Sequence, residues 1–290
     1  MTPFVPAPGQ ILEKDLELYP EGVILPIDKP YRWTSADVIR KIKWNAGKHF
    51  GRKNIKVGHA GTLDPLATGV LLVCIGKATK IAEELQSHEK EYVAGVSFGA
   101  VTPSYDLEKD IDAVFPLEGV SEESLRAVLP QFIGEQMQVA PLFSAKSVDG
   151  VRAYETARKL LKQGRLDEGS DILQASRITI YDLQLQSFSP AEGTVSENRA
   201  TLIPAADGSC SINEKSGRIH VADISGYNLP TAMVRVDCSK GTYIRALARD
   251  LGEALDSGAF LSSLRRTKNG GIAVEDSLSL DDTAEILKIC

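Results

Sequence analysis

Two hydrophobic patterns alternate along the chain, a two-residue period that predicts strands and a helical period that predicts helices. Strands are expected where apolar residues alternate with polar ones or form a short run, at residues 22–30, 70–76, 91–99, 176–188 and 233–239. Helices are expected at residues 34–47, 78–87, 121–134, 152–164 and 243–258, with a short helix in the C-terminal tail. The clearest helical stripe consists of Ile244, Leu247, Ala248, Leu251 and Leu255.

Local signals indicate where several of these elements begin and end. Thr34 or Ser35 is the expected N-cap of the first helix, Pro130 should end or kink the third, and Gly164 is the expected C′ residue of the fourth. Strands and helices follow one another irregularly, through hairpin-like and long connections, and no repeat is visible. The pattern favours a mixed α/β or α+β sheet over a doubly wound parallel one.

A length of 290 residues suits one large domain or two modest ones. Residues 1–22 are proline-rich and then acidic, and we expect a loose N-terminal arm there. The main domain is expected at residues 23–280, with a possible insertion at 189–230 that is rich in Ser, Gly, Asn and Pro and contains a strand-like stretch at 218–225. Residues 281–290 are expected to form a short C-terminal tail.

The composition is that of a globular protein, and the charge is unevenly spread. The net charge of −6 on its own disfavours a nucleic-acid partner. However, residues 40–56 carry seven Lys or Arg and no acid, whereas residues 106–123 carry seven acids and one base. An anionic partner meets the local surface rather than the sum, so the first stretch keeps such a partner open.

The four cysteines, at positions 74, 210, 238 and 290, form no CxxC pair and are too few for a disulfide framework. The Cys and His residues also lack the spacing of a zinc site, so no metal is expected. The sequence shows no signal peptide and no apolar run of membrane-spanning length. These features predict a reduced cytoplasmic protein without a membrane role.

The stretch GHAGTLDPLATG, residues 58–69, places one carboxylate, Asp64, in a glycine-rich segment ahead of a proline. Taken alone, an Asp-Pro pair of this kind is most often a turn device. The stretch is not a phosphate-binding P-loop, because the GxxxxGK[ST] pattern is absent.

A second stretch, DCSKGTYIRALARDLG at residues 237–252, leaves a strand through Ser239, Lys240 and Gly241 and enters the clearest helix. Arg245 and Arg249 lie one turn apart on that helix and can face one site. The alternative is a helix with ordinary surface arginines. LRRTKNGG, residues 264–271, adds basic residues in what is expected to be a turn-like end, either facing phosphate or solvated.

These stretches carry a resemblance to a known family. Together with IDKPYRWTS, KEYVAGVSFGAVTPSYD and PLFSAKSVDGVRAYETAR, they occur in the order found in the TruB family of bacterial tRNA pseudouridine synthases, and the matched blocks span residues 27–271. The resemblance implies an α+β fold with a mixed, largely antiparallel sheet and flanking helices. It also implies the isomerisation of uridine to pseudouridine at position 55, in the T-loop of tRNA, without a cofactor or metal.

The resemblance also implies residue roles. Asp64 matches the catalytic aspartate, which acts as a nucleophile on the ribose, on the base, or through a glycal route. Arg245 would pair with that carboxylate, Tyr92 would stack on the flipped base, and Tyr243 would assist removal of the C5 proton. The expected substrate-binding residues are His59, Leu264, Lys29, Gly61, Thr62, Lys240 and Arg265. The glycines of the Asp64 stretch would leave room for the nucleotide, and the basic clusters, including Arg40, Lys41 and Lys43, would contact tRNA phosphates.

The chain departs from the family pattern in places. Arg32 occupies a usual glycine position, so the turn there is expected to differ, because arginine does not readily adopt a positive φ. Phe143 replaces a tyrosine and Ser147 a lysine, with Lys146 one residue early. Many members carry a C-terminal PUA domain, for which the tail is too short, so tRNA is expected to be held by the catalytic domain and its insertion.

Three alternatives differ in class. A catalytically silent RNA-binding protein would not need Asp64, Tyr92, Tyr243 and Arg245 together. A glycosidase would need two acids, and only Asp106 and Asp250 are available in the matched blocks. A guide-dependent, dyskerin-like enzyme would need the additional RNA-binding domain. The expected partner is therefore the tRNA T-arm, bound by a monomer with no obligate protein partner.

Overall fold

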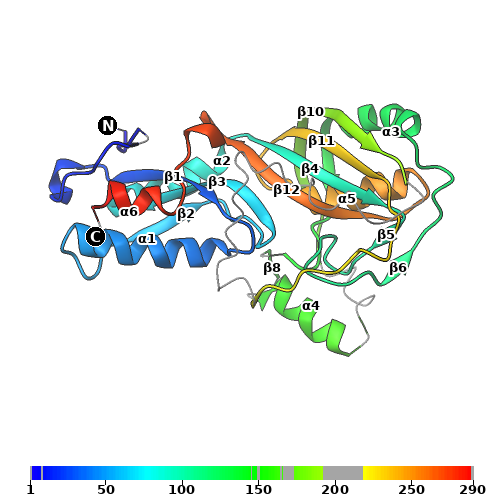
Figure 1. Cartoon of the computed structure of the whole chain (residues 1–290), viewed down its shortest axis with the longest axis horizontal. Coiled ribbons are helices and arrows are strands. Elements are labelled where there is room, and N and C mark those ends of the chain that lie inside the picture. The colour runs from blue at the N-terminus through cyan, green and yellow to red at the C-terminus, as the bar shows by residue number, and fades with distance from the viewer. Residues whose placement is uncertain are drawn as a thin grey trace. The chain divides into compact units, whose positions relative to one another are not determined.

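The computed structural model describes residues 2–7, 9–144, 146–148, 151–163, 165, 173–191 and 218–288. Within this part, the chain forms two compact units. Unit 1 comprises residues 1–92, 212–219 and 264–290, and unit 2 comprises residues 93–211 and 220–263. Each unit is built around a stretch of β-sheet with helices on its faces, and Figure 1 gives the element labels used below.

The sheet of unit 1 is centred on β3 (Ala67–Ile75), in which every residue is buried, as its continuous apolar run predicts. β1 (Val23–Lys29) pairs antiparallel along one edge of β3. On the other edge, β2 (Val57–Ala60) pairs antiparallel with its second half, and β12 (Ala259–Asn269) pairs parallel with Ala67–Gly69. β13 (Ile272–Ala273) continues antiparallel from β12. Of the pairings between these five strands, that of β12 with β3 is parallel and the others are antiparallel, so this part of the sheet is largely antiparallel.

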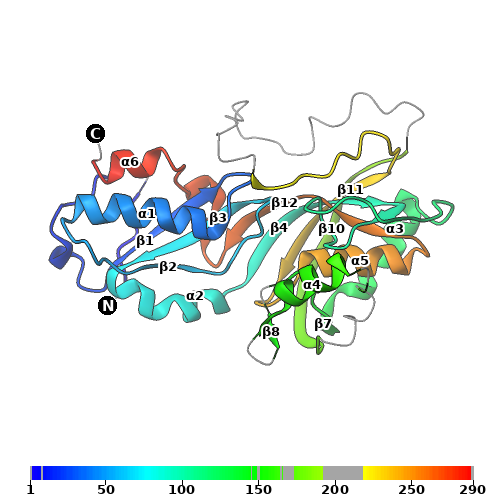
Figure 2. The same ribbon diagram turned by 90° about the horizontal axis from the view of Figure 1, so that it is seen from below.

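Helices cover both faces of these strands, as Figure 2 shows for α1 (Ser35–His49) and α2 (Ala82–Ser87). Thr34 is the N-cap of α1 and forms a capping box with Asp37, which confirms one of the two expected caps. Val70, Leu72 and Cys74 of β3 pack toward α2 in one apolar cluster. The helix expected at residues 78–87 begins instead as the 3-10 helix η2 (Gly76–Ile81) and becomes α2.

Both ends of the chain pack against unit 1. The 3-10 helices η1 (Leu16–Leu18) and η6 (Val274–Asp276) and the helix α6 (Asp282–Ile286) belong to these ends. The Phe4 amide donates to the Gly22 carbonyl, and the Phe4 carbonyl accepts from the Ile24 amide of β1. Leu12 is fully buried, and its amide donates to the Ile286 carbonyl. The prediction of a loose N-terminal arm is therefore wrong, because these long-range contacts hold the arm and the composition does not reveal them.

In unit 2 the strand order is β12, β4 (Lys90–Phe98), β11 (Thr231–Cys238), β10 (Ser176–Ser189) and β7 (Gly134–Gln138). β10 pairs antiparallel with both β11 and β7. Figures 1 and 2 show α5 (Ile244–Ala254) along one face of these strands. The predicted apolar stripe of α5 is buried throughout, at Ile244, Leu247, Ala248, Leu251 and the following Leu255.

Shorter elements complete unit 2. They are β5 (Ala100–Val101), β6 (Ala113–Val114), α3 (Glu122–Val128), η3 (Leu129–Phe132), β8 (Ser147–Val148), β9 (Val151–Arg152) and α4 (Ala153–Lys162). Pro130 lies in η3, so the α-helix ends before it as predicted. Among the described residues, no helix is both long and apolar enough to cross a membrane.

Two predictions from pattern are wrong. Arg265, Arg266 and Lys268 lie within strand β12 rather than in a turn, and the turn comes only at the glycines that follow. Residues 218–225 form no strand, because backbone bonds such as that from Ala222 to Leu107 are isolated. Gly164 and most of the expected insertion at 189–230 lie outside the described residues.

One glycine of the Asp64 stretch, Gly69, has a backbone role. Gly61 and Gly69 have φ of +92° and +99°, which other residues rarely adopt. A Cβ on Gly69 would lie 2.1 Å from the Arg266 carbonyl oxygen, because β12 approaches β3 closely there. Gly69 therefore leaves room for a strand, not for the nucleotide that was expected.

This difference gives a stability prediction. Gly69→Ala should lower the free energy of unfolding by about 3 kcal/mol or more, because both the positive φ and the contact with β12 are lost. Gly58→Ala is the matched control in the same stretch, since a Cβ there would meet only a Thr79 methyl at 3.9 Å. Urea unfolding compares the two, and equal stabilities would contradict the close approach.

Candidate functional site

The segment between β2 and β3 carries Asp64, which is half-buried and so can reach a ligand. The backbone of this segment is anchored by the Ser35 side chain at the start of α1. The Ser35 hydroxyl donates to the Leu63 carbonyl and accepts from the Leu63 amide, both at 3.0 Å. The Ala67 amide also donates to the Asp64 carbonyl at 3.1 Å. The segment is therefore a rigid loop of unit 1, which we call the Asp64 loop (residues 61–66).

Two buried cations tie the same loop to the strands around it. Lys29, at the end of β1, is completely buried, and its ammonium donates to the carbonyls of Pro30 (3.1 Å), Trp33 (2.5 Å) and Pro65 (3.3 Å). Arg266 of β12 is also buried and donates to the carbonyls of Val70 (2.7 Å) and Gly61 (3.2 Å). Lys29 thus positions the loop, and the substrate contact expected of it stays a prediction.

His59 lies on β2, two residues before Gly61. Its Nδ1 is buried and has no hydrogen-bond partner among the described residues. Burial lowers the pKa of His59 below the ordinary 6.5, and the nearby Arg266 guanidinium lowers it further. The lowered pKa favours the neutral imidazole at pH 7. Thr62, in contrast, is exposed on the Asp64 loop.

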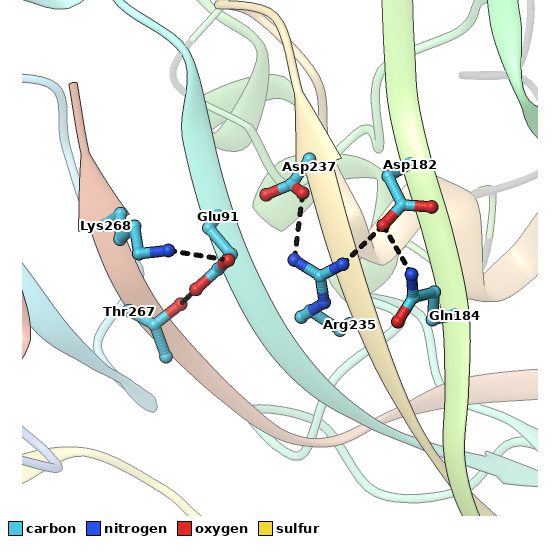
Figure 3. Close-up of polar contacts among 7 residues, drawn as sticks. All are labelled: Glu91, Asp182, Gln184, Arg235, Asp237, Thr267 and Lys268. Carbon is cyan, nitrogen blue, oxygen red and sulfur yellow. Dashed lines mark hydrogen bonds and ion pairs between the residues drawn. The ribbon is translucent and has the colours of Figure 1, made fainter. Parts of the chain in front are cut away.

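Tyr92 and Leu264 lie on neighbouring strands of unit 1. Tyr92 on β4 is largely buried, and Leu264 on β12 is half-buried opposite Ala67 of β3. Next to Tyr92, the Glu91 carboxylate accepts from the Thr267 hydroxyl (2.6 Å) and the Lys268 ammonium (3.1 Å), as Figure 3 shows. This clamp joins β4 to β12 and fixes the strand on which Tyr92 lies.

Arg245 lies in the first turn of α5 in unit 2 and is buried. Its guanidinium donates to the carbonyls of Ser104 and Phe143, each at 3.0 Å, and lies 3.6 Å from the Asp106 carboxylate. Asp106 is itself buried, and it accepts from the Ser104 hydroxyl at 2.6 Å and the Glu108 amide at 2.9 Å. Sequence reasoning considered Asp106 only as a second acid for hydrolysis and missed this ion pair.

The start of α5 is tied to β7 by Gln138. The Gln138 side chain accepts from the Tyr243 amide at 2.9 Å and donates to the Tyr243 carbonyl at 3.2 Å. The Tyr243 ring packs partly buried against Ala140 and Leu173. Lys240, just before the helix, is exposed. Further along unit 2's sheet, Arg235 bridges Asp182 and Asp237 (Figure 3).

Several basic residues expected to contact phosphate have acid partners. Arg265 pairs with Asp28 at 2.8 Å, and Asp28 also accepts from the Gly69 amide at 3.1 Å. Arg40 pairs with Asp37 at 2.9 Å, and Lys41 lies 3.9 Å from Asp281. These partners reduce the charge that Arg265, Arg40 and Lys41 offer to RNA, and the phosphate contacts expected of these residues stay a prediction.

The departures from the family pattern have local explanations. Arg32 does adopt a positive φ, +61°, so the predicted change of the turn is wrong. Its guanidinium donates to the Ile219 carbonyl at 2.8 Å, which helps to offset the strain of this conformation. Lys146 donates to the Gln174 carbonyl and the Ser176 hydroxyl, and the Phe143 ring lies under the Lys109 ammonium.

Unit 1 thus brings together Asp64, His59, Gly61, Thr62, Lys29, Tyr92, Leu264 and Arg265. Unit 2 holds Tyr243, Arg245 and Lys240. Asp64 belongs to unit 1 and Arg245 to unit 2, and their expected pairing stays a prediction. Among the described residues, no group of three or more His, Cys, Asp or Glu side chains is arranged to hold a metal ion.

The anchoring of the Asp64 loop predicts the effect of a small change at Ser35. Ser35→Ala should lower the free energy of unfolding by about 1–3 kcal/mol, because the buried Leu63 amide and carbonyl lose their partner. Ser87→Ala is the control, since its exposed hydroxyl donates only to the Glu84 carbonyl. If urea unfolding gave equal stabilities for the two variants, Ser35 would not anchor the loop.

The lowered pKa of His59 predicts a pH effect on stability. A group whose pKa is depressed by folding stabilises the protein above its unfolded value of 6.5, and this contribution is lost as the pH falls through the folded value. His59→Gln should therefore reduce the loss of stability between about pH 7 and pH 5. His220→Gln, at an exposed histidine beside Asp110, should leave that loss in place. Thermal melting across this range measures both, and an unchanged profile for His59→Gln would contradict the argument.

Comparison with known proteins agrees with these features. TruB_N, described as the N-terminal domain of TruB family pseudouridylate synthase, matches residues 48–200. The tRNA pseudouridine synthase B of Phocaeicola vulgatus is 44% identical over 270 residues, or 93% of this chain and 94% of the relative. That of Bacteroides thetaiotaomicron is 42% identical over 261 residues, or 90% of each chain.

Among solved structures, a chain of the archaeal box H/ACA sRNP Nop10–Cbf5 complex has a TM-score of 0.55 and 22% identity. The match covers 98% of this chain and 60% of that one, so this chain spans about three fifths of its length. This likeness confirms the predicted α+β fold. With the identity to the two bacterial synthases, it leads to one assignment: the chain belongs to the TruB family of pseudouridylate synthases.

Proposed function

We propose that the protein converts uridine to pseudouridine at position 55 in the T-loop of tRNA, with Asp64 as the nucleophile. The observation that carries the proposal is a reachable carboxylate on a loop whose backbone is held by the buried side chains of Ser35, Lys29 and Arg266. The names of the relatives that are more than 40% identical support tRNA as the substrate.

The reaction needs a single carboxylate. The glycosidic bond between C1′ and N1 breaks, the uracil turns, and C1′ bonds to C5. The C5 proton then leaves and N1 gains a proton, so the product is an isomer of the substrate and no cofactor is consumed. Asp64 can serve by attacking C1′, by attacking the base, or by taking a proton in a glycal route. In each case the carboxylate must stay ionised and oriented, which a fixed loop favours.

The other site residues have supporting roles in this proposal. The target base must leave its stack to reach Asp64, and Tyr92 would then stack on it, with Leu264 as an apolar wall of the pocket. Base stacking on an aromatic ring contributes about 1–3 kcal/mol. Tyr243 would assist proton removal from C5, and Arg245 would keep Asp64 charged. The proposal requires Asp64 and Arg245 to act at the same nucleotide.

Hydrolysis by paired acids finds no support in the two other candidate carboxylates. Asp106 is buried and engaged by Arg245, Ser104 and Glu108. Asp250 pairs with Arg249 at 2.7 Å, and burial raises its pKa. Asp106 is therefore closed to a glycosidic bond, and the Asp250 carboxylate is engaged by Arg249.

We infer that a single chain acts on tRNA in the cytoplasm without an obligate protein partner. The structural neighbours come from ribonucleoprotein complexes, but their likeness to this chain concerns the fold alone. The alternative of a silent RNA-binding protein predicts the same fold and no product, so an activity measurement separates the two.

The decisive experiment incubates the purified protein with unmodified tRNA transcript and maps pseudouridine along it. Asp64→Asn should lower the rate by about 10³-fold or more, while tRNA affinity stays within a few-fold. Asp276→Asn, at an exposed aspartate of unit 1, should leave both unchanged.

Two results would overturn the proposal. Undiminished product from Asp64→Asn would remove Asp64 from the chemistry. A product of the unmutated protein at any position other than the T-loop uridine would overturn the substrate assignment.

A further inference from the structure

A cleft of about 330 Å³ lies in unit 1, and its lining includes none of the residues expected to act at the reacting nucleotide. Three chain segments line it: the turn around η1, the loop between α1 and β2, and η2 after β3. The lining residues that matter here are Glu17, Arg52, Lys56, Lys77 and Lys80. In Figure 1, η1 and the carboxyl end of α1 lie at the same end of unit 1.

The cleft is strongly basic although the protein is acidic overall. Four of its lining residues are cations and one is a carboxylate. That carboxylate, Glu17, forms an ion pair with Arg52. Lys56, Lys77 and Lys80 are exposed, and no ion pair joins any of them to an acid in the part of the chain that the structure describes. Three uncompensated positive charges therefore face one cleft, which creates a local positive potential.

The fold holds these lysines together. The Gly76 amide donates to the Lys56 carbonyl at 2.8 Å, so the chain segments that carry Lys56 and Lys77 lie side by side. Gly22, which also lines the cleft, packs closely against the same backbone. A Cβ on Gly22 would lie 2.4 Å from the Ile75 carbonyl oxygen and 2.5 Å from the Ala78 amide nitrogen. The cleft is therefore a built feature of packed backbone, with lysine side chains at its rim.

The cleft and Asp64 lie at opposite ends of β3. Asp64 precedes the strand at Ala67, and η2 follows it at Gly76. At about 3.3 Å per residue, the eight steps from Ala67 to Ile75 separate the two sites by about 26 Å. That distance equals the rise of about eight stacked base pairs. A helical RNA stem spans this distance and carries phosphates along its whole length.

We propose that this cleft binds backbone phosphates of the substrate RNA, in a helical stem remote from the reacting uridine. The inference rests on the proposed function, since it takes the RNA at Asp64 as the ligand. Lysine ammonium groups act as point charges on phosphate and make no demand on base sequence. The contact contributes affinity and register for the whole RNA, and it leaves the chemistry at Asp64 unaffected.

The experiment compares the unmutated protein with the triple variant Lys56→Gln, Lys77→Gln and Lys80→Gln. Each phosphate contact contributes about −0.9 to the slope of log affinity against log salt concentration. For full-length tRNA we expect the slope to become about 2–3 less negative and the affinity at low salt to fall about tenfold or more. Filter binding from about 50 to 200 mM salt gives both quantities.

Two controls make the result specific to the cleft. The variant with arginine at the same three positions keeps the charges and should bind tRNA as the unmutated protein does. A hairpin with a stem of about five base pairs spans only about 17 Å, so it cannot reach the cleft from Asp64. Its affinity and its rate of pseudouridine formation should stay within twofold in the triple Gln variant.

Three outcomes would overturn the inference: an unchanged salt slope with full-length tRNA, an equal loss of affinity for the hairpin, or an equal loss in the Arg variant. Failure of the proposed function is recognised separately, because it would appear as no pseudouridine from the unmutated protein on either RNA.

Discussion

A carboxylate on an irregular loop can act as a nucleophile only if the backbone beneath it stays in place. In this protein Ser35, Lys29 and Arg266 hold that backbone through the polar groups of Leu63, Pro65 and Gly61. All three side chains are buried and come from different elements, α1, β1 and β12. The side chain of Asp64 can therefore remain half-exposed while hydrogen bonds from these buried side chains hold the main chain of the loop in place.

The use of buried cations for this purpose has an electrostatic cost. Moving an ammonium or guanidinium out of water is unfavourable unless its donors find acceptors. Lys29 and Arg266 find acceptors in the Pro65 and Gly61 carbonyls of the Asp64 loop and in other backbone carbonyls beside it, so the cations and these carbonyls satisfy each other. In unit 2 the buried Arg245 guanidinium also finds acceptors, because it donates to two backbone carbonyls and lies beside the buried Asp106 carboxylate. Such pairings orient a side chain more strongly than they stabilise the fold.

The basic residues of unit 1 also divide into two groups, those paired with acids and those that face the cleft without an acid partner among the described residues. The acids outnumber the bases over the whole chain, yet the lysines around the cleft of unit 1 face it without acid partners in the described part of the chain. Several basic residues near the Asp64 loop are paired, as Arg265 is with Asp28. Some basic residues are thus paired within the protein, and other basic residues are available to an anionic ligand. The amino-acid composition counts both kinds together.

The sequence by itself determined the elements whose signals are local. The buried β3, the stripe of α5, the capping box of α1 and the end of α3 before Pro130 all follow from periodicity, capping and proline geometry. The motif around Asp64 was equally visible, because its residues are contiguous. Only the tertiary structure decided which charged residues are buried and paired. Lys29 and Asp106 look like surface or catalytic groups in the sequence, and each has one partner that is distant along the chain, Pro65 for Lys29 and Arg245 for Asp106. The sequence likewise indicated that Gly69 leaves room for a ligand, but β12 occupies that room. Packing sets such contacts between distant segments, so they leave no local signal in the sequence.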